Sequence, residues 1–161
     1  MQFDVIYKEN YEKLFSIARK MVNDKEAAYD IVQNVFVYYF EKSQAGHVIE
    51  NTSSWLLRAT INKCIDHSSY RKSFIPLDDL SQKEEPQEDE SDKKQTEAVV
   101  RKALRQLKSK KEMQLVILYS EGYSYKEMSE ITGIKFTSIG KTLSRTLKKL
   151  KEILIKMEYE T

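Results

Sequence analysis

The sequence contains few of the residues that interrupt helices. Only four glycines and two prolines occur among its 161 residues. A chain built from strands and tight turns needs more of both, because turns use the positive φ of glycine and the fixed φ of proline. Lysine, glutamate, leucine and isoleucine are plentiful instead. The composition therefore predicts an all-α protein, long enough for one ordinary domain or two small ones.

Cysteine, histidine and long apolar runs are also scarce. Cys64 is the only cysteine, so no disulfide can form within the chain, and its apolar helical surroundings favour a buried structural thiol. His47 and His67 supply no ligand cluster, so no metal or small-molecule cofactor is implied. No apolar run approaches the ~20 residues of a membrane span. The first residues lack the basic start and apolar core of a signal peptide. We expect a cytoplasmic protein without membrane insertion.

Charge is segregated along the chain, although the formal net charge is only +2. Residues 1–73 carry ten basic and nine acidic side chains, residues 74–97 carry three and nine, and residues 98–161 carry fourteen and seven. The C-terminal third is therefore basic. It predicts a polyanionic partner, because Lys and Arg displace the counterions condensed on phosphates.

Helical periodicity divides the chain into two parts. Apolar residues three and four apart predict helices at 3–22, 25–42 and 55–71, which would form an N-terminal domain at 1–73. The second of these helices would bury an apolar side from Ala28 to Phe40, and Ser53 or Ser54 would cap the third. Residues 74–96 are acidic and hold both prolines, which predicts a flexible linker. Four further helices would form a second domain at 97–161.

Residues 122–150 have the pattern of a helix-turn-helix. Ser124 and Glu127 have the spacing of a capping box, and Gly133 ends the first helix where a positive φ is wanted. The second helix turns an apolar stripe toward a core and keeps a basic face; the stripe comprises Ile139, Leu143, Leu147 and Leu150. Such a helix reads the DNA major groove. The alternative is an ordinary pair of bundle helices with solvated lysines.

Motifs in both halves resemble a bacterial RNA polymerase sigma factor of the extracytoplasmic-function (ECF) type. Residues 28–36, AYDIVQNVF, stand where the family has A-E-D-(L/I)-V-Q-x-V-F. Trp55-Leu56, Asn62 and Asp66 follow the family's W-L-x5-N-x3-D spacing. The second domain adds Ala103-Leu104, Leu107, residues 118–128, Ile139, Leu143, Arg145 and Leu150. The resemblance covers nearly the whole chain, with the motifs in the family's order.

This resemblance implies two helical domains, called regions 2 and 4. Region 2 would bind the clamp helices of the polymerase β′ subunit and read the −10 promoter element. Region 4 would bind the β flap and read the −35 element, and the linker would run into the polymerase's RNA path. The implied partners are core RNA polymerase, promoter DNA and an anti-sigma factor wedged between the domains. No small-molecule substrate is implied.

A polar stripe on the second predicted helix is the expected polymerase-docking face. Asp30 and Gln33 match the family's pattern there. The whole stripe comprises Asp30, Gln33, Asn34, Val37 and Glu41. The alternative is an ordinary solvated helix face.

The third predicted helix would hold the melted −10 strand, since single-stranded bases need cationic groups and flat side chains. The candidate residues are Arg58, Asn62, Lys63, Asp66, His67, Tyr70, Arg71 and Lys72. Asn62 can pair with a base edge, whereas Asp66 has a structural alternative at a helix end. By resemblance, the loop at residues 43–51 would supply a pocket for a flipped base.

The start of the second helix of the helix-turn-helix would enter the −35 groove. The candidates are Lys135, Phe136, Thr137, Ser138, Lys141, Thr142, Arg145 and Lys148. Thr137 has the chemistry of an N-cap, and Arg145 is expected on a backbone phosphate. For Lys148 and Lys149, a solvated face is an equal alternative.

Four positions depart from the family's pattern. Tyr29 stands where the family has a Glu, and Ser69 stands where an Arg is common. Gly140 and Lys141 occupy positions usually held by a Lys and a Ser. Gly140 costs about 1 kcal/mol of helix propensity and would let DNA or another helix approach closely.

Two other classes of protein fit the sequence less well. A helix-turn-helix regulator that never joins polymerase leaves the polar stripe and the linker without a role. An enzyme would need a glycine-rich phosphate loop, paired metal ligands or a nucleophile with a base, and the sequence shows none of these.

Overall fold

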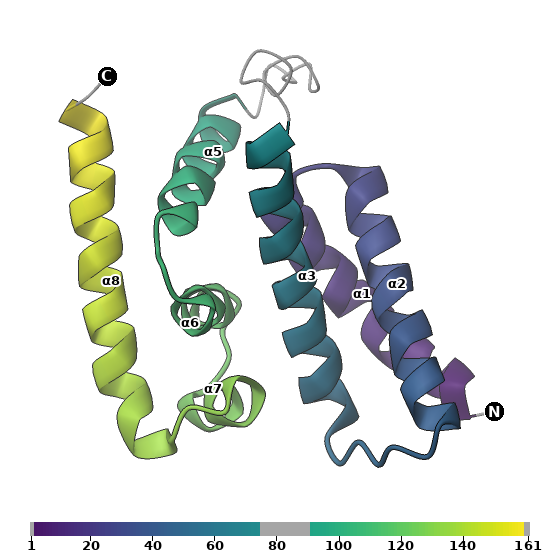
Figure 1. The fold of residues 1–161 in the computed structure, drawn as a ribbon. Coiled ribbons are helices and arrows are strands. Elements are labelled where there is room, and N and C mark those ends of the chain that lie inside the picture. Colours follow the sequence, from purple (N-terminus) through teal and green to yellow (C-terminus); the bar gives the residue numbers. More distant parts are fainter. Residues whose placement is uncertain (1, 75–90, 160–161) are drawn as a thin grey trace.

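The computed structural model describes residues 2–74 and 91–159, with side chains described at 2–67 and 98–158. Within these ranges the chain is helical and contains no strand. The helices are α1 (Gln2–Val22), α2 (Lys25–Gln44), α3 (Thr52–Phe74), α5 (Ser91–Arg105), α6 (Lys110–Ser120), α7 (Tyr125–Thr132) and α8 (Phe136–Tyr159). The predicted all-α fold with two helical domains is confirmed (Figure 1).

The N-terminal domain is a bundle of α1, α2 and α3. Asn23 adopts a positive φ of 52° between α1 and α2, and the Asp24 side chain caps α2 by accepting the backbone N–H groups of Glu26 and Ala27. Large apolar side chains from all three helices are fully buried; among them are Leu14, Ile17, Phe36, Leu56 and Ile61. Cys64 is buried as predicted, and desolvation raises the pKa of its thiol to about 12.

The C-terminal domain is formed by α5, α6, α7 and α8. Ser109 caps α6, and the predicted capping box of α7 is present: Ser124 and Glu127 exchange hydrogen bonds of 3.0 and 3.1 Å. Gly133 ends α7 with a φ of 79°, in the left-handed region where a side chain is unfavourable. Ile139, Leu143 and Leu150 of α8 are buried, as their spacing predicts.

Three details differ from the expectations. Asn51, not Ser53 or Ser54, caps α3, because its Oδ1 accepts the Ser54 N–H at 3.1 Å and the helix begins earlier, at Thr52. Phe40 is 42% exposed and lies at the edge of the core, with its ring 5.2 Å from that of Phe3. Helix α5 begins at Ser91, inside the predicted linker. Its first residues are polar and show no apolar stripe, but their residue types favour a helix. The boundaries at 73 and 97 stay predictions, and residues 75–90 lie outside the described ranges.

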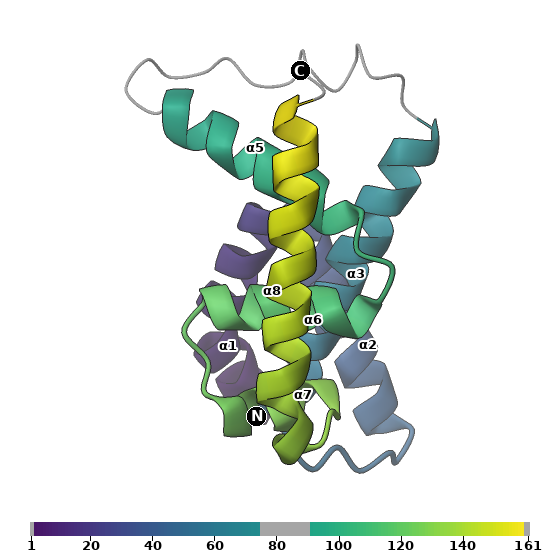
Figure 2. The same ribbon diagram turned by 90° about the vertical axis from the view of Figure 1, so that its left-hand side faces the viewer.

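Helix α3 lies in the middle of the molecule. Figure 1 shows α1 and α2 on one side of it, α5, α6 and α7 on the other, and α8 outermost; Figure 2 shows α8 running across α6 and α7. One continuous cluster of buried apolar side chains joins the two domains. It includes Leu56 and Ile61 of α3 together with Leu115, Met128 and Ile131 of α6 and α7.

Candidate nucleic-acid interface

A groove of about 320 Å³ runs between α2 and α3, and four of the predicted −10 residues line it. These four are Arg58, Asn62, Lys63 and Asp66. Their spacing along α3 follows the helical repeat, so one face of the helix presents them together. The structure therefore brings half of the predicted −10 set into one concave surface.

Aromatic side chains from both helices also line the groove. Tyr38 of α2 stacks on Trp55 of α3 with ring centroids 5.7 Å apart and planes inclined by 26°. The ammonium group of Lys42 lies 5.2 Å from the centre of the Tyr38 ring, within the range of a cation–π contact. Flat rings beside cations are what a single-stranded nucleic acid requires.

Sequence reasoning missed Tyr38, Lys42 and the groove role of Trp55. The spacing of Tyr38 and Lys42 could have indicated that they act together, since residues four apart lie on the same face of a helix. The predicted stripe included their neighbours Val37 and Glu41 but neither Tyr38 nor Lys42. Trp55 was identified only as part of a family motif; in the structure it is half buried and lines the groove.

The remaining −10 candidates continue along α3 beyond the groove. His67 is half buried. The backbone of Tyr70, Arg71 and Lys72 is helical, and their side chains lie outside the described part of the chain. The loop expected to hold a flipped base spans residues 45–51 in the structure, because α2 continues to Gln44. In it Gly46 has a φ of 90° and Val48 is exposed.

The C-terminal domain touches the same face of α3. Arg58 Nη1 donates to the carbonyl oxygen of Ile131 at 3.1 Å, in the last turn of α7, where helix carbonyls lack intrahelical partners. Gln114 Nε2 donates to Asn62 Oδ1 at 2.6 Å, and Lys110 Nζ pairs with Asp66 Oδ1 at 2.7 Å. Three groove residues are therefore bound to the other domain.

The first turns of α8 form a second, exposed surface. Seven of the eight predicted −35 residues are exposed, and Thr142 is half buried. Phe136 is 58% exposed at the turn, an unusual position for an aromatic ring without a partner surface. Thr137 is not the N-cap, because α8 already begins at Phe136.

Glu112 of α6 holds the central part of α8. Its carboxylate accepts the Thr146 hydroxyl at 2.9 Å and pairs with Lys149 Nζ at 3.3 Å. This ion pair holds Lys149 toward α6, with its side chain still 52% exposed. Lys141, Arg145 and Lys148 are exposed as well. Of the two lysines for which a solvated face was the equal alternative, Lys149 is thus exposed and paired with Glu112.

Gly140 permits a close contact between α7 and α8. A Cβ atom at this position would lie 3.3 Å from Cε2 of the Tyr125 ring. Tyr125 is the first residue of α7, and its ring rests against the exposed start of α8. The departure from the family's Lys therefore accommodates another helix of the same domain, one of the two possibilities expected from the sequence.

The polar stripe of α2 lies on the surface. Asp30, Asn34, Val37 and Glu41 are exposed, and Gln33 is half buried because its Nε2 donates to the Tyr7 hydroxyl at 2.8 Å. Val37 is 54% exposed. Exposed apolar rings lie beside the stripe, those of Tyr29 and Phe40.

Comparison with known proteins relates both domains to one family. Residues 6–74 match Sigma-70 region 2, and residues 98–150 match Sigma-70, region 4. The chain belongs to the RNA polymerase sigma factors. Sigma factors direct promoter recognition and the initiation of transcription, and the members of the family are not enzymes.

Individual relatives agree with the ECF type of sigma factor. RNA polymerase sigma factor SigZ of Bacillus subtilis (strain 168) is 26% identical over 156 residues, which are 96% of this chain and 88% of SigZ. ECF RNA polymerase sigma factor SigM of Mycobacterium tuberculosis (strain H37Rv) is 23% identical over 154 residues, 94% of this chain and 76% of SigM. The resemblance read from the motifs is confirmed.

The fold of this sigma factor is also found in a solved structure. Sigma factor RpoE of Bartonella quintana, in complex with the anti-sigma factor NepR, aligns with a TM-score of 0.55 and 21% identity over 95% of this chain and 96% of RpoE. Among the described helices, none is long and apolar enough to cross a membrane.

Proposed function

We propose that this sigma factor holds the melted −10 strand in the groove between α2 and α3 while α8 occupies the −35 major groove. The observation that carries the proposal is the groove itself. It combines a stacked aromatic pair with the cations Lys42, Arg58 and Lys63. Bases stack on rings whatever their sequence, and cations meet the backbone phosphates.

Asn62 supplies the sequence reading in the groove. Its carboxamide offers one acceptor and two donors, so it can pair with a base edge in a way that a lysine cannot. Asp66, four residues on, accepts hydrogen bonds when ionised. The aromatic pair and the lysines give affinity, and these two side chains favour some bases over others.

Helix α8 contacts the −35 duplex through its first turns. Thr137 and Ser138 offer hydroxyl groups to a phosphate or a base, and Lys141 lies one turn further on. Arg145 extends the same exposed face and meets a backbone phosphate. A second helix presented in this way across a glycine-ended turn enters the major groove in helix-turn-helix proteins.

Core RNA polymerase docks on the exposed stripe of α2. Acidic Asp30 and Glu41 surround the exposed apolar side chain of Val37, and the hydroxyl of Tyr7 fixes the amide of Gln33. Such a mixture of apolar centre and polar rim suits a protein partner. Because the stripe and the groove occupy α2 and its neighbour α3, docking would deliver the groove to the promoter.

RNA synthesis itself belongs to the polymerase, so this factor acts without catalysing a reaction. It works in the cytoplasm, where the polymerase is. As RpoE of Bartonella quintana is bound by NepR, an anti-sigma factor is the expected regulatory partner of this chain.

The groove assignment is tested by Lys42→Ala with Lys63→Ala. We expect weaker binding of the polymerase–sigma complex to single-stranded −10 DNA and fewer transcripts from a duplex promoter, with unchanged affinity for core polymerase. Lys8→Ala with Lys25→Ala removes the same charge from exposed positions outside the groove and serves as the control. Equal transcription by both double variants would show that the groove does not hold the −10 strand.

A further inference from the structure

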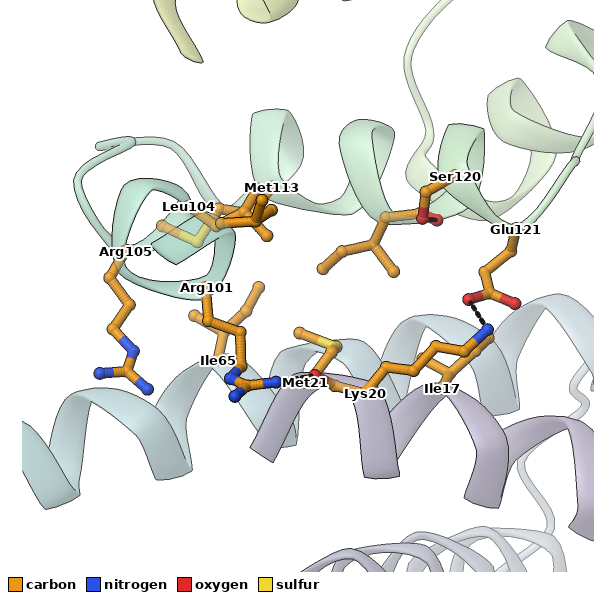
Figure 3. Close-up of a pocket in the computed structure, with 12 residues that line it drawn as sticks. Ile17, Lys20, Met21, Ile65, Arg101, Leu104, Arg105, Met113, Ser120 and Glu121 are labelled. Atoms are coloured by element: carbon orange, nitrogen blue, oxygen red, sulfur yellow. Dashed lines mark hydrogen bonds and ion pairs between the residues drawn. The ribbon is translucent and has the colours of Figure 1, made fainter. Parts of the chain in front are cut away.

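A cavity of about 240 Å³ lies between α1, α3, α5 and α6. Its interior is apolar, and Figure 3 shows Ile17, Met21 and Ile65 facing Leu104 and Met113 across it. An engineered cavity of about 150 Å³ in another protein, lined by similar side chains, excludes water and binds benzene. The cavity between these four helices is larger, so it has room for a longer apolar group.

The apolar lining combines fixed and adaptable side chains. Ile17 and Ile65 are almost completely buried, with exposed fractions of 2% and 7%, and their branched side chains form a firm floor. Met21 of α1 and Met113 of α6 are half buried. Methionine is unbranched and polarizable, so it adjusts to groups of irregular shape. A flexible hydrocarbon chain can follow a surface of this kind, because both sides can change rotamer to improve their contact.

The rim of the cavity is charged, with positive charge in excess. Among the described residues that line it, Lys20, Arg101 and Arg105 are basic and Glu121 is acidic. Lys20 Nζ pairs with Glu121 Oε1 at 2.8 Å, so these two charges balance each other. The two arginines of α5 supply the excess. Because Lys20 and Arg105 are exposed and Arg101 is half buried, the charges lie where the cavity meets solvent.

Arg101 and Arg105 are placed to act on one anionic group. They are four residues apart, so they lie on the same face of α5, and Figure 3 shows both side chains extending away from α5 at the edge of the cavity. Arg101 Nη1 donates to the Lys20 carbonyl oxygen at 3.3 Å, which holds the guanidinium group beside the end of α1. A guanidinium group has five N–H donors, so Arg101 can keep this bond and also bind a carboxylate. Such charge-assisted pairs are often bidentate.

We propose that this cavity binds a medium-chain fatty acid, with the hydrocarbon tail between Met21 and Met113 and the carboxylate at Arg101 and Arg105. The apolar lining selects the tail, and the excess of positive charge selects an anionic head over an alcohol or an amine. Within the described part of the chain, the cavity and the −10 groove share no lining residue. Binding of the fatty acid therefore requires neither polymerase nor promoter DNA and can be measured on the protein alone.

Isothermal titration calorimetry of the full-length protein with decanoate, kept below its micelle concentration, measures this binding. Octanoate has two fewer methylene groups to bury and should bind roughly tenfold more weakly. Decanol has the tail of decanoate without its charge and should also bind about tenfold more weakly. Because the cavity is finite, affinity should stop rising once the chain is longer than the cavity can hold. A continuous rise up to hexadecanoate, or equal binding of decanol and decanoate, would overturn the proposal.

Methionine methyl groups report where the ligand binds. Met21 and Met113 line the cavity, whereas Met128 is buried in α7 and Met157 lies near the end of α8. In NMR spectra of protein with isotope-labelled methionine methyl groups, decanoate should shift the signals of Met21 and Met113 and leave those of Met128 and Met157 in place. Met21→Leu and Met113→Leu assign the two cavity signals. Shifts confined to Met128 or Met157 would locate the ligand elsewhere and refute the assigned site.

Removal of the two arginine charges tests the carboxylate site. Arg101→Gln with Arg105→Gln should lower the affinity for decanoate by about tenfold and leave the affinity for decanol unchanged. Lys102→Gln with Lys108→Gln removes equal charge at exposed positions that do not line the cavity, so this variant is the matched control and should bind decanoate like the wild type. An equal loss in both double variants would show that overall charge, and not the arginine pair, attracts the carboxylate, which would overturn the assignment.

A larger side chain in the cavity gives a second, independent measurement. Leu104→Trp should occupy the space of the tail and abolish binding of both decanoate and decanol, and circular dichroism checks that the helices of the variant are intact. Decanoate should also raise the Tm of the wild type, because it binds the folded chain, and should leave the Tm of Leu104→Trp unchanged. Undiminished binding by the folded Leu104→Trp variant, or no binding by the wild type, overturns the fatty-acid site even where transcription by the wild type stands.

Discussion

Removal of two exposed cations from α8 gives the sharpest test of the −35 surface. Lys141 and Arg145 lie four residues apart on the exposed face of the helix, and no ion pair holds either of them within residues 98–158. Lys149, by contrast, is paired with Glu112. In Lys141→Ala with Arg145→Ala, therefore, the protein loses two side chains free to meet phosphates, and alanine preserves the helix.

The size of the effect follows from counterion release. Each phosphate contact contributes about −0.9 to the slope of log K against log salt concentration. Two lost contacts should make the slope less steep by about 1.8. Between roughly 50 and 200 mM salt, the wild type should then lose about tenfold more affinity than the variant loses.

Fluorescence anisotropy with a labelled duplex that carries the upstream promoter element measures this slope. Lys151→Ala with Lys156→Ala, toward the end of the same helix, removes equal charge and should leave the slope close to that of the wild type. A slope unchanged in the Lys141–Arg145 variant, or equally reduced in the control, would refute the assignment of the first turns of α8 to DNA.

Three further predictions concern the stability of single elements. Gly140→Ala should raise the free energy of unfolding by about 0.5 kcal/mol, because the gain in helix propensity exceeds the cost of shifting the half-exposed Tyr125 ring. A fall in the denaturant midpoint would show that the ring cannot move. Ser124→Ala should cost about 1 kcal/mol through the lost cap of α7, as chemical denaturation would measure, whereas an unchanged midpoint would mean that α7 does not depend on its cap. The Ser124 backbone N–H, and then its side chain, holds the pKa of Glu127 below its usual value. The stabilisation from the Glu127 carboxylate is therefore complete above the ordinary carboxyl range and is lost as the pH falls through the lowered pKa. The difference in Tm between wild type and Glu127→Gln should shrink on acidification. A difference that grows on acidification would contradict this reasoning.

Features encoded within a few residues could be read from the sequence. The capping box at Ser124 and Glu127, the positive φ of Gly133 and the buried stripe of α8 all depend on local spacing, and all are present. Asn51 was missed because Ser53 and Ser54 are equally good caps by residue type. Only the start of α3 at Thr52 decides among them.

The groove and the domain interface could not be read in the same way. The Tyr38–Trp55 stack joins two helices across a loop, and its geometry depends on how α2 and α3 pack. The bond between Gln114 and Asn62 spans 52 residues and two domains. Periodicity assigns a residue to a face of its own helix, but it does not say which other helix will cover that face.

All the assignments above depend on one function, the direction of core RNA polymerase to promoters by this chain. Run-off transcription with purified bacterial core polymerase on a fragmented genomic template, with and without the protein, tests it most directly. We expect discrete new transcripts that depend on the protein and share two upstream sequence elements. Absence of such transcripts from a preparation that binds DNA and is free of partner proteins would contradict it.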